Sequence, residues 1–176
     1  MVIKDRNFVP FIGADEIAAI VARLGREISS CGVVGSRPLL VCPVLTGAYM
    51  FAADLVRQIT LDTEVRFVRY TSYIGMQSSG EVRCELPFGD IEGRDLLIVE
   101  DVIDSGLSMG KMLAEVKTLK PARVRVCALL MKPGAFKGDY NVDFVGREIG
   151  NEFIVGYGMD YDEAGRALDA VYKVEN

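Results

Sequence analysis

One stretch near the middle of the chain, 96–110, constrains the fold more than any other. It begins with four apolar residues, 96–99, that no polar residue interrupts. Such a run is typical of a strand buried on both faces, although a buried helix shows the same pattern. A short polar turn follows, and from Met109 apolar residues recur at helical spacing as far as Leu119. The stretch therefore predicts a strand, a turn and a helix of an α/β fold.

Acidic residues follow the predicted strand, and small residues form the predicted turn. Glu100 and Asp101 lie ahead of the turn, which consists of Asp104, Ser105, Gly106 and Ser108. Ligands of open α/β sheets bind at the carboxyl ends of strands, where this turn lies. Small residues let backbone N–H groups approach an anion, and the following helix favours negative charge at its start, so the turn suits a phosphate. The acids suit ribose hydroxyls or a divalent cation held through oxygen atoms. These features indicate a sugar phosphate with Mg²⁺; the simpler alternative is that the acids solvate a loop or that Asp104 or Ser105 caps the helix.

The composition excludes several classes of protein and of catalytic site. The chain has 176 residues, 50% of them hydrophobic and 26% charged, which fits a single domain over 1–176 with a sizeable core. Its net charge of −5 disfavours a nucleic-acid surface. The chain contains no histidine, which excludes Ser-His-Asp hydrolysis and histidine-ligated metal sites. Any general base must then be a carboxylate, a lysine, a tyrosine or a cysteine.

The cysteines and the apolar segments indicate a cytoplasmic protein. Cys31, Cys42, Cys84 and Cys127 lie far apart and form no CxxC pair, which is typical of reduced thiols. No apolar segment approaches the roughly 20 residues that span a membrane. The first residues lack the apolar region of a signal peptide. We therefore expect no membrane and no nucleic acid among the partners.

Helical and strand patterns alternate along the rest of the chain. Helices are predicted at 14–30 and 49–59, and strands at 39–45, 65–70, 124–131, 143–146 and 153–157. The alternation predicts a mainly parallel sheet with helices on both sides. The segment 65–70 alternates apolar and basic residues and suits a strand exposed on one face. The polar segment 71–83 is too long for a tight hairpin, so we expect a functional or mobile loop there.

Five blocks of sequence follow one another in a recognisable order. They are VLTGAYMFAADL at 44–55, Ser72-Tyr73, VEDVIDSGLS at 99–108, Lys132-Pro133 and FIVGYGMDYDEAGRAL at 153–168. The third block closely resembles the signature with which purine phosphoribosyltransferases bind phosphoribosyl diphosphate (PRPP). The others are similar to the diphosphate loop, the start of the mobile loop, the Lys-Pro pair and the Phe-Val-Val-Gly-Tyr segment of the hypoxanthine-guanine branch. The chain therefore resembles that branch over most of its length.

This resemblance implies a fold, a reaction and a set of partners. The fold would be the type I phosphoribosyltransferase fold, a mainly parallel twisted sheet flanked by helices, with a small hood built from the chain ends. The reaction would be transfer of the 5-phosphoribosyl group from PRPP to N9 of hypoxanthine or guanine in purine salvage, with Mg²⁺ as cofactor. The partners would be PRPP, a 6-oxopurine base, the nucleotide monophosphate (IMP or GMP), diphosphate, and further copies of the chain in a dimer or tetramer. A xanthine-preferring enzyme is the alternative.

The resemblance also implies roles for individual residues. Asp104 would be the catalytic residue, facing N7 of the purine. Ribose and 5′-phosphate would be bound by Glu100, Asp101, Ser105, Gly106, Leu107 and Ser108. Diphosphate would be bound by Thr46, Gly47, Ser72, Tyr73 and Arg166. The purine would be bound by Lys132, Phe153 and Ile154, and Mg²⁺ by Glu100, Asp101 and Asp160.

Three positions depart from the family pattern. Relatives often carry Lys or Arg at the position of Thr46, an apolar residue at that of Arg147, and Ile-Pro-Asp where this chain has Ile-Gly-Asn at 149–151. Because Gly150 lacks the fixed φ of proline, we expect a looser base-binding segment, and we expect Arg147 to influence base selectivity.

Two other classes of function compete with this interpretation. A non-catalytic PRPP sensor would be expected to lose Asp104 or the Ser72-Tyr73 pair, and this chain keeps both. An adenine or pyrimidine phosphoribosyltransferase is the more serious alternative. Lys132 disfavours the adenine enzyme, because its ammonium group would oppose the amino group of adenine.

Overall fold

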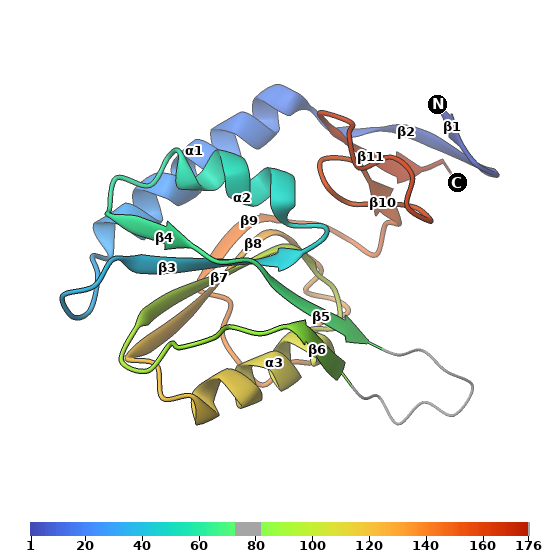
Figure 1. Cartoon of the computed structure of the whole chain (residues 1–176). Helices are drawn as coiled ribbons and strands as arrows, with labels where there is room; N and C mark the ends of the chain where they lie inside the picture. Colours follow the sequence, from blue (N-terminus) through green and yellow to red (C-terminus); the bar gives the residue numbers. More distant parts are fainter. Residues whose placement is uncertain (73–81, 176) are drawn as a thin grey trace.

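A large sheet occupies the centre of the computed structural model, which describes residues 1–72 and 82–175 (Figure 1). Its strands are β3 (Leu39–Leu45), β4 (Thr63–Val65), β5 (Val68–Ser72), β6 (Val82–Leu86), β7 (Asp95–Ile103), β8 (Arg123–Met131) and β9 (Phe144–Glu148). Within the described residues the order is β6-β5-β3-β7-β8-β9, with β4 paired to the start of β3. Neighbouring strands are parallel except for β5 and β6. The predicted mainly parallel sheet is confirmed.

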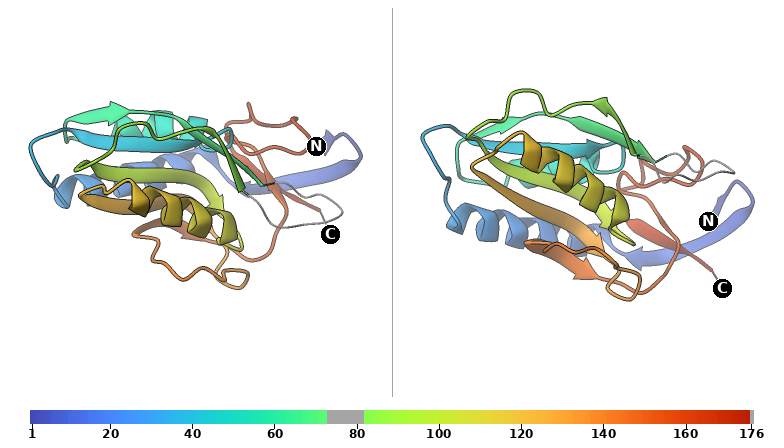
Figure 2. Two further views of the ribbon diagram at one scale, coloured as in Figure 1. Left: turned by 60° about the horizontal axis from the view of Figure 1, so that its bottom comes forward. Right: turned by 90° about the horizontal axis from the view of Figure 1, so that it is seen from below.

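Helices cover both faces of this sheet. α1 (Ala14–Ser30) and α2 (Tyr49–Val56) lie on one face, and α3 (Leu107–Thr118) lies on the other (Figures 1 and 2). α1 has its predicted bounds because a continuous apolar stripe from Ile17 to Ile28 is buried against the sheet. α2 ends three residues before the predicted end, and Ile59 beyond it turns back into the core. None of the described helices is long and apolar enough to cross a membrane.

β7 is longer than the apolar run predicted. Its parallel pairing with β8 continues beyond Val99, through Glu100 opposite Ala128, to Ile103. Glu100 and Asp101 therefore lie in the strand, and the prediction that the strand ends at Val99 is wrong. The backbone hydrogen bonds of the parallel ladder fix these residues in extended conformation whatever the polarity of their side chains.

α3 also begins earlier than the helical spacing indicated. Its first residue is Leu107, and its N-cap is Gly106 in the left-handed region at φ 73°. The alternative that Asp104 or Ser105 caps the helix is therefore wrong. Ser108 lies in the first turn of the helix, so only 104–106 form the turn itself.

The segment 65–70 is two strands with a break between them. Both β4 and β5 pair with β3, and Arg66 lies in the break. The backbone N–H of Arg66 donates to the carbonyl of Val41 at 2.9 Å, and its guanidinium donates to the carbonyl of Asp90 at 3.1 Å. The prediction of one continuous strand is wrong, because the strand pairing is interrupted where Arg66 makes these hydrogen bonds.

The two ends of the predicted loop 71–83 pair with each other. Residue 71 lies opposite 83, and Ser72 at the end of β5 lies opposite Val82 at the start of β6, in antiparallel register. The loop between the two strands is thus shorter than predicted. Tyr73 and the rest of 73–81 lie outside the described residues.

A smaller sheet, the hood, is built from the two ends of the chain. It consists of β1 (Val2–Ile3), β2 (Arg6–Ile12), β10 (Ile154–Val155) and β11 (Val171–Val174). In the described chain the order is β1-β2-β11-β10, and every pair is antiparallel. The hood lies beyond the carboxyl end of β3, and both chain termini are part of it (Figure 1). The expected hood from the chain ends is confirmed, although β10 is shorter than the strand predicted at 153–157.

Candidate active site

Two adjoining hollows lie at the carboxyl end of β7. The Asp104 hollow has a volume of about 170 Å³ and is lined by Glu100, Val102, Ile103, Asp104, Ser105, Gly106, Ser108 and Met109. The Arg166 hollow has a volume of about 310 Å³ and is lined by Thr46, Gly47, Asp101, Val102, Ile154, Met159, Asp160 and Arg166. Val102 lines both, so the two hollows are neighbours. Together they bring most of the residues singled out in the sequence to one end of the sheet, where open α/β folds bind ligands.

A cation and a carboxylate meet at the edge of the Asp104 hollow. The ammonium Nζ of Lys132 donates to Asp104 Oδ2 at 2.7 Å. Lys132 follows β8 directly, and its backbone N–H donates to the carbonyl of Ile103 at 2.9 Å, which places it beside the end of β7. The side chain of Lys132 is 11% exposed and that of Asp104 is 56% exposed. A bound molecule would therefore meet a proton acceptor and a positive charge within the same small volume.

The turn of the Asp104 hollow is held from behind by aromatic residues. The hydroxyl of Tyr140 donates to the carbonyl of Gly106 at 3.0 Å. A Cβ at Gly106 would lie 2.5 Å from the ring of Phe136, so no side chain fits there. The carbonyl of Ser105 accepts the N–H of Lys137 at 2.9 Å. The turn is thus fixed with the positive end of α3 behind it, an arrangement that favours an anion.

The two acids of β7 are shifted in their titration. Burial, reinforced by the neighbouring Asp101, raises the pKa of Glu100 well above its ordinary value. Burial also raises the pKa of Asp101 to about 6; backbone N–H groups and Arg166 oppose the rise, and Asp160 adds to it. Glu100 Oε2 is buried and has no hydrogen-bond partner among the described residues. Burying a carboxylate without a partner is costly, so these acids suit a ligand that supplies hydroxyl groups or positive charge.

The Arg166 hollow combines a guanidinium group with exposed main chain. Arg166 Nη2 lies 2.8 Å from Asp160 Oδ1, and Arg166 Nη1 donates to the carbonyl of Gly158 at 3.0 Å. A Cβ at Gly47 would lie 2.0 Å from Asp101 Oδ2, and a Cβ at Gly158 would lie 2.1 Å from the carbonyl oxygen of Gly47. Asp101, Gly47 and Gly158 therefore form a stack that has no space for a side chain at either glycine. The peptide bond that precedes Thr46 in this wall is cis.

The acidic residues fit a magnesium ion only when a substrate supplies further ligands. The described residues contain no group of three or more acidic, cysteine or histidine side chains placed to hold a metal ion. Asp101 and Asp160 face the same hollow, and the negative charge of Asp160 raises the pKa of Asp101. Mg²⁺ is commonly bound through one or two carboxylates together with substrate phosphates and water. The donor set therefore fits an ion that binds together with a phosphorylated substrate.

Phe153 and Leu107, which were singled out in the sequence, line neither hollow. Phe153 precedes β10 and is 44% exposed; its ring centroid lies 5.5 Å from that of Tyr161. Leu107 is 55% exposed and lines neither hollow. Ser72 ends β5, and Tyr73 lies outside the described residues.

Arg147 is occupied elsewhere. Its Nη1 lies 2.5 Å from Glu16 Oε1 on α1, and its guanidinium lies 5.5 Å from the centroid of the Phe11 ring on β2. It lines neither hollow. Nothing in these contacts supports the expected influence on base selectivity.

Sequence reasoning missed several residues that build the site, some of them outside the five blocks. Tyr140 and Phe136 fix the turn, although no local pattern connects them with a residue 30 or more positions earlier. Met159 lines the Arg166 hollow, and its position beside Asp160 in the last block was the signal available. Val102, which directly follows Asp101 in β7, lines both hollows.

Comparisons with known proteins agree with this geometry. A family model described as "Phosphoribosyl transferase domain" matches residues 13–162. The chain is 43% identical over 164 residues to the hypoxanthine-guanine phosphoribosyltransferase of Mycobacterium avium, covering 90% of this chain and 81% of that one. It is 37% identical over 176 residues to the hypoxanthine-guanine phosphoribosyltransferase of Aquifex aeolicus, covering 99% and 98%. A solved structure of a hypoxanthine-guanine phosphoribosyltransferase from Bacillus anthracis, with HEPES in its active site, has a TM-score of 0.88 at 32% identity and covers 97% of this chain and 100% of that one.

Proposed function

The chain belongs to the phosphoribosyltransferase family, and we propose that it is a hypoxanthine-guanine phosphoribosyltransferase of purine salvage. It transfers the 5-phosphoribosyl group of PRPP to N9 of hypoxanthine or guanine, which forms IMP or GMP and releases diphosphate. The observation that carries the proposal is the Lys132–Asp104 pair, which presents a cation and a proton acceptor beside a turn suited to phosphate.

The ribose 5-phosphate part of PRPP fits the Asp104 hollow. The turn at 104–106 and the first residues of α3 offer backbone N–H groups and the hydroxyls of Ser105 and Ser108 to the 5′-phosphate. Glu100 and Asp101 lie in β7 directly before this turn, within reach of the ribose hydroxyls. The buried Oε2 of Glu100 has no hydrogen-bond partner among the described residues, and a sugar hydroxyl that donates to it would supply one.

The purine base fits beside Lys132 and Asp104. A 6-oxopurine becomes a better nucleophile at N9 when it loses a proton, and Asp104 accepts that proton at N7. The ammonium group of Lys132 favours the negative charge that then develops on O6. The chain has no histidine, and Asp104 is the carboxylate placed to do this acid–base work. Ile154 and the exposed ring of Phe153 on the hood side would bound the base.

The leaving diphosphate fits the Arg166 hollow. As the bond at the anomeric carbon breaks, positive charge builds on the ribose and negative charge on diphosphate, so alignment and electrostatic stabilisation supply most of the catalysis. Arg166 and the main chain at Thr46 and Gly47 stabilise the departing oxygens. With no lysine or arginine at the position of Thr46, this stabilisation depends on backbone and on Arg166. Mg²⁺ bound with PRPP would neutralise diphosphate charge, held by Asp160 and Asp101 with Glu100 nearby.

Further features of this enzyme belong to the same proposal. Ser72 and Tyr73, the second of which lies outside the described residues, would contribute to diphosphate binding, as the family resemblance implies. Residues 1–176 form one domain, and copies of the chain associate as a dimer or tetramer in the cytoplasm. Light scattering of the purified protein would measure the state of association.

A panel of bases tests the function directly. Purified protein with PRPP and Mg²⁺ is expected to convert hypoxanthine to IMP and guanine to GMP, with little turnover of adenine or uracil. Turnover of xanthine above hypoxanthine would identify a xanthine-preferring enzyme instead. Turnover of adenine or uracil without any of hypoxanthine would overturn the proposal. In a matched variant, Lys132→Gln, the rate with 6-oxopurines should fall while binding of PRPP is retained.

A further inference from the structure

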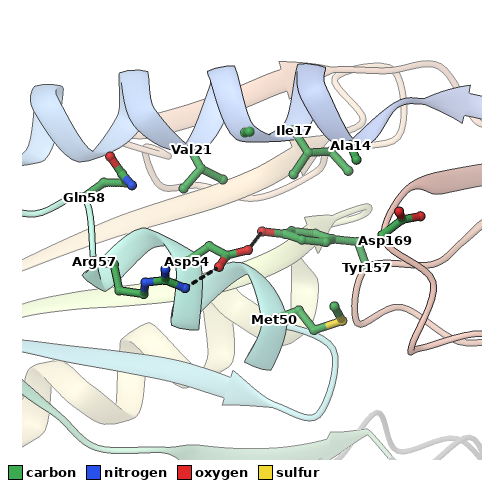
Figure 3. Close-up of a pocket in the computed structure, with 10 residues that line it drawn as sticks. Ala14, Ile17, Val21, Met50, Asp54, Arg57, Gln58, Tyr157 and Asp169 are labelled. Carbon is green, nitrogen blue, oxygen red and sulfur yellow. Dashed lines mark hydrogen bonds and ion pairs between the residues drawn. The ribbon is translucent and has the colours of Figure 1, made fainter.

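A groove lies between α1 and α2, outside the two hollows. It has a volume of about 350 Å³, and the side of it that α1 contributes is apolar, with Ile17 and Val21 (Figure 3). At one end lies the ring of Tyr157, which is 5% exposed. Its hydroxyl points to α2 and donates to Asp54 Oδ2 at 2.6 Å (Figure 3). This hydrogen bond joins residues 103 positions apart in the sequence.

Each partner of this bond is close in sequence to residues that line the Arg166 hollow. Asp54 lies on α2, which begins at Tyr49, two residues after Gly47. Tyr157 is followed directly by Gly158, and Asp160 comes two residues later. A contact between Tyr157 and Asp54 therefore fixes one wall of the hollow relative to the other.

The main chain around Tyr157 leaves little freedom for this segment to move. Tyr157 itself has a positive φ of 48°, and its N–H donates to the carbonyl of Leu168 at 2.9 Å. The N–H of Gly158 donates to the carbonyl of Arg166 at 2.9 Å, and the Arg166 guanidinium returns a bond to the carbonyl of Gly158. On its other side Gly158 contacts the carbonyl of Gly47 so closely that a Cβ would not fit. A shift of Tyr157 would therefore be passed to both sides of the hollow.

The phenol is the principal partner of Asp54. Burial, and secondly the bond to Asp54, raise the pKa of Tyr157, so the phenol keeps its proton and donates it at any ordinary pH. The other contact of Asp54 is Arg57 Nη1 at 3.5 Å, and the Arg57 side chain is 77% exposed. Exposed ion pairs of this kind contribute little.

We propose that Tyr157 and Asp54 are positioning residues whose hydrogen bond holds the Gly158–Asp160 segment against the Thr46-Gly47 turn and thereby sets the width of the Arg166 hollow. The inference rests on the proposed function, because it assigns this hollow to diphosphate. The bond acts on the affinity for the diphosphate part of PRPP, and the purine part is read elsewhere by Lys132 and Asp104.

The Tyr157→Phe variant tests the proposal, since it keeps the ring and removes only the hydroxyl. We expect the KM for PRPP to rise about tenfold, the scale of one lost buried hydrogen bond, with the KM for hypoxanthine changed less than about twofold. Asp54→Leu should reproduce this pattern. Asp54→Asn keeps an oxygen that accepts the phenol proton and should restore most of the affinity. The double variant Tyr157→Phe with Asp54→Leu should be no worse than either single variant.

Tyr172→Phe is the matched control. It removes a phenol hydroxyl from β11 of the hood. This hydroxyl has no hydrogen-bond partner in the part of the chain that the structure describes, so the variant should leave both KM values unchanged. Equal KM values for PRPP in Tyr157→Phe and wild type would overturn the proposal, as would a parallel rise in both KM values. Calorimetric binding of PRPP with Mg²⁺ gives the same comparison without turnover. A wild-type protein that binds PRPP but does not turn over hypoxanthine would contradict the proposed function and still test the positioning role.

Discussion

At the scale of single residues, the geometry of Asp104 and Lys132 separates a chemical role from a structural one. Asp104 is more than half exposed and sits at the mouth of its hollow, whereas Lys132 is largely buried behind it. Because Lys132 is already largely buried, its side chain loses little further solvation when a ligand arrives. The pair is therefore ready to bind a base whose charge changes during reaction.

The Asp104→Asn variant is expected to lose turnover and to keep its affinity for PRPP. The amide has the size of the carboxylate but does not accept the N7 proton, so kcat should fall on the order of 10²-fold, the scale of general acid–base catalysis. Steady-state kinetics and calorimetric titration with PRPP would measure both effects. Asp139→Asn, which removes an exposed carboxylate outside both hollows, is the control. An unchanged kcat would reduce Asp104 to a residue that shapes the turn.

Asp101 predicts a pH dependence of stability in the ligand-free protein. Its pKa of about 6 lies above the ordinary value. The folded state therefore keeps a proton that the unfolded state has lost, between about pH 4 and about pH 6. The contribution of Asp101 to the free energy of unfolding is thus fully present below about pH 4 and is lost as the pH rises through about 6.

Asp101→Asn has no such proton to lose. We therefore compare the free energy of unfolding of the variant with that of the wild type at two pH values. The variant should gain about 1–3 kcal/mol relative to the wild type between about pH 4.5 and about pH 7.5. Urea unfolding at the two pH values measures this change. Exposed Asp62→Asn should show the same difference from wild type at both. A gain in stability that grows toward acid would contradict the assigned shift.

At the scale of elements, the β7–turn–α3 unit depends on one backbone conformation. Gly106 has a positive φ and contacts two aromatic residues where a Cβ would lie. Gly106→Ala should therefore lower the free energy of unfolding by about 1–3 kcal/mol and weaken PRPP binding, because the turn must shift. Gly134→Ala has open space around its Cβ and should stay within about 0.5 kcal/mol of wild type. Equal stability of the two variants would mean that the turn tolerates a side chain.

The elements also show where sequence patterns succeed and where they stop. α1 and β3 have the bounds predicted, because a helical stripe and a continuous apolar run are strong local signals. β7 extends beyond its apolar run since pairing with β8, not side-chain polarity, decides where it ends. The hood strands β2 and β11 were not predicted: β11 is short, β2 contains Pro10, and both are stabilised by pairing between opposite ends of the chain.

The candidate site divides along the same line. Residues within contiguous motifs, such as Asp104 and Gly106, could be identified because the motif itself brings them together. Tyr140, which holds the turn, could not, since its contact depends on how the segment after β8 folds back. For the same reason the ion pair of Arg147 with Glu16 of α1 was beyond the reach of sequence patterns.

At the scale of the whole molecule, the site is shared between two sheets. The large sheet supplies the acids and the phosphate turn, while the hood supplies Ile154 and the segment that leads to Asp160. A ligand that reaches both parts should bring them together, and one that reaches only the large sheet should not.

Hydrogen exchange would distinguish these two kinds of ligand. Ribose 5-phosphate should slow exchange of the backbone amides at 105–108 and leave the hood amides unchanged. IMP should slow exchange at 105–108 and also in β10, because its base contacts the hood. Comparison at equal fractional saturation removes the effect of different affinities. Identical protection by the two ligands would show that the base does not reach the hood.

The stack of Asp101, Gly47 and Gly158 has a consequence for inhibitors. Part of the Arg166 hollow is walled by main chain, and no side chain can be introduced at either glycine without displacing the carboxylate or the facing carbonyl. An inhibitor that hydrogen-bonds to this main chain would contact backbone atoms, which no amino-acid substitution removes. Resistance by a point mutation at Gly47 or Gly158 would displace the same wall that holds the substrate's diphosphate, so the mutant enzyme would lose its substrate together with the drug.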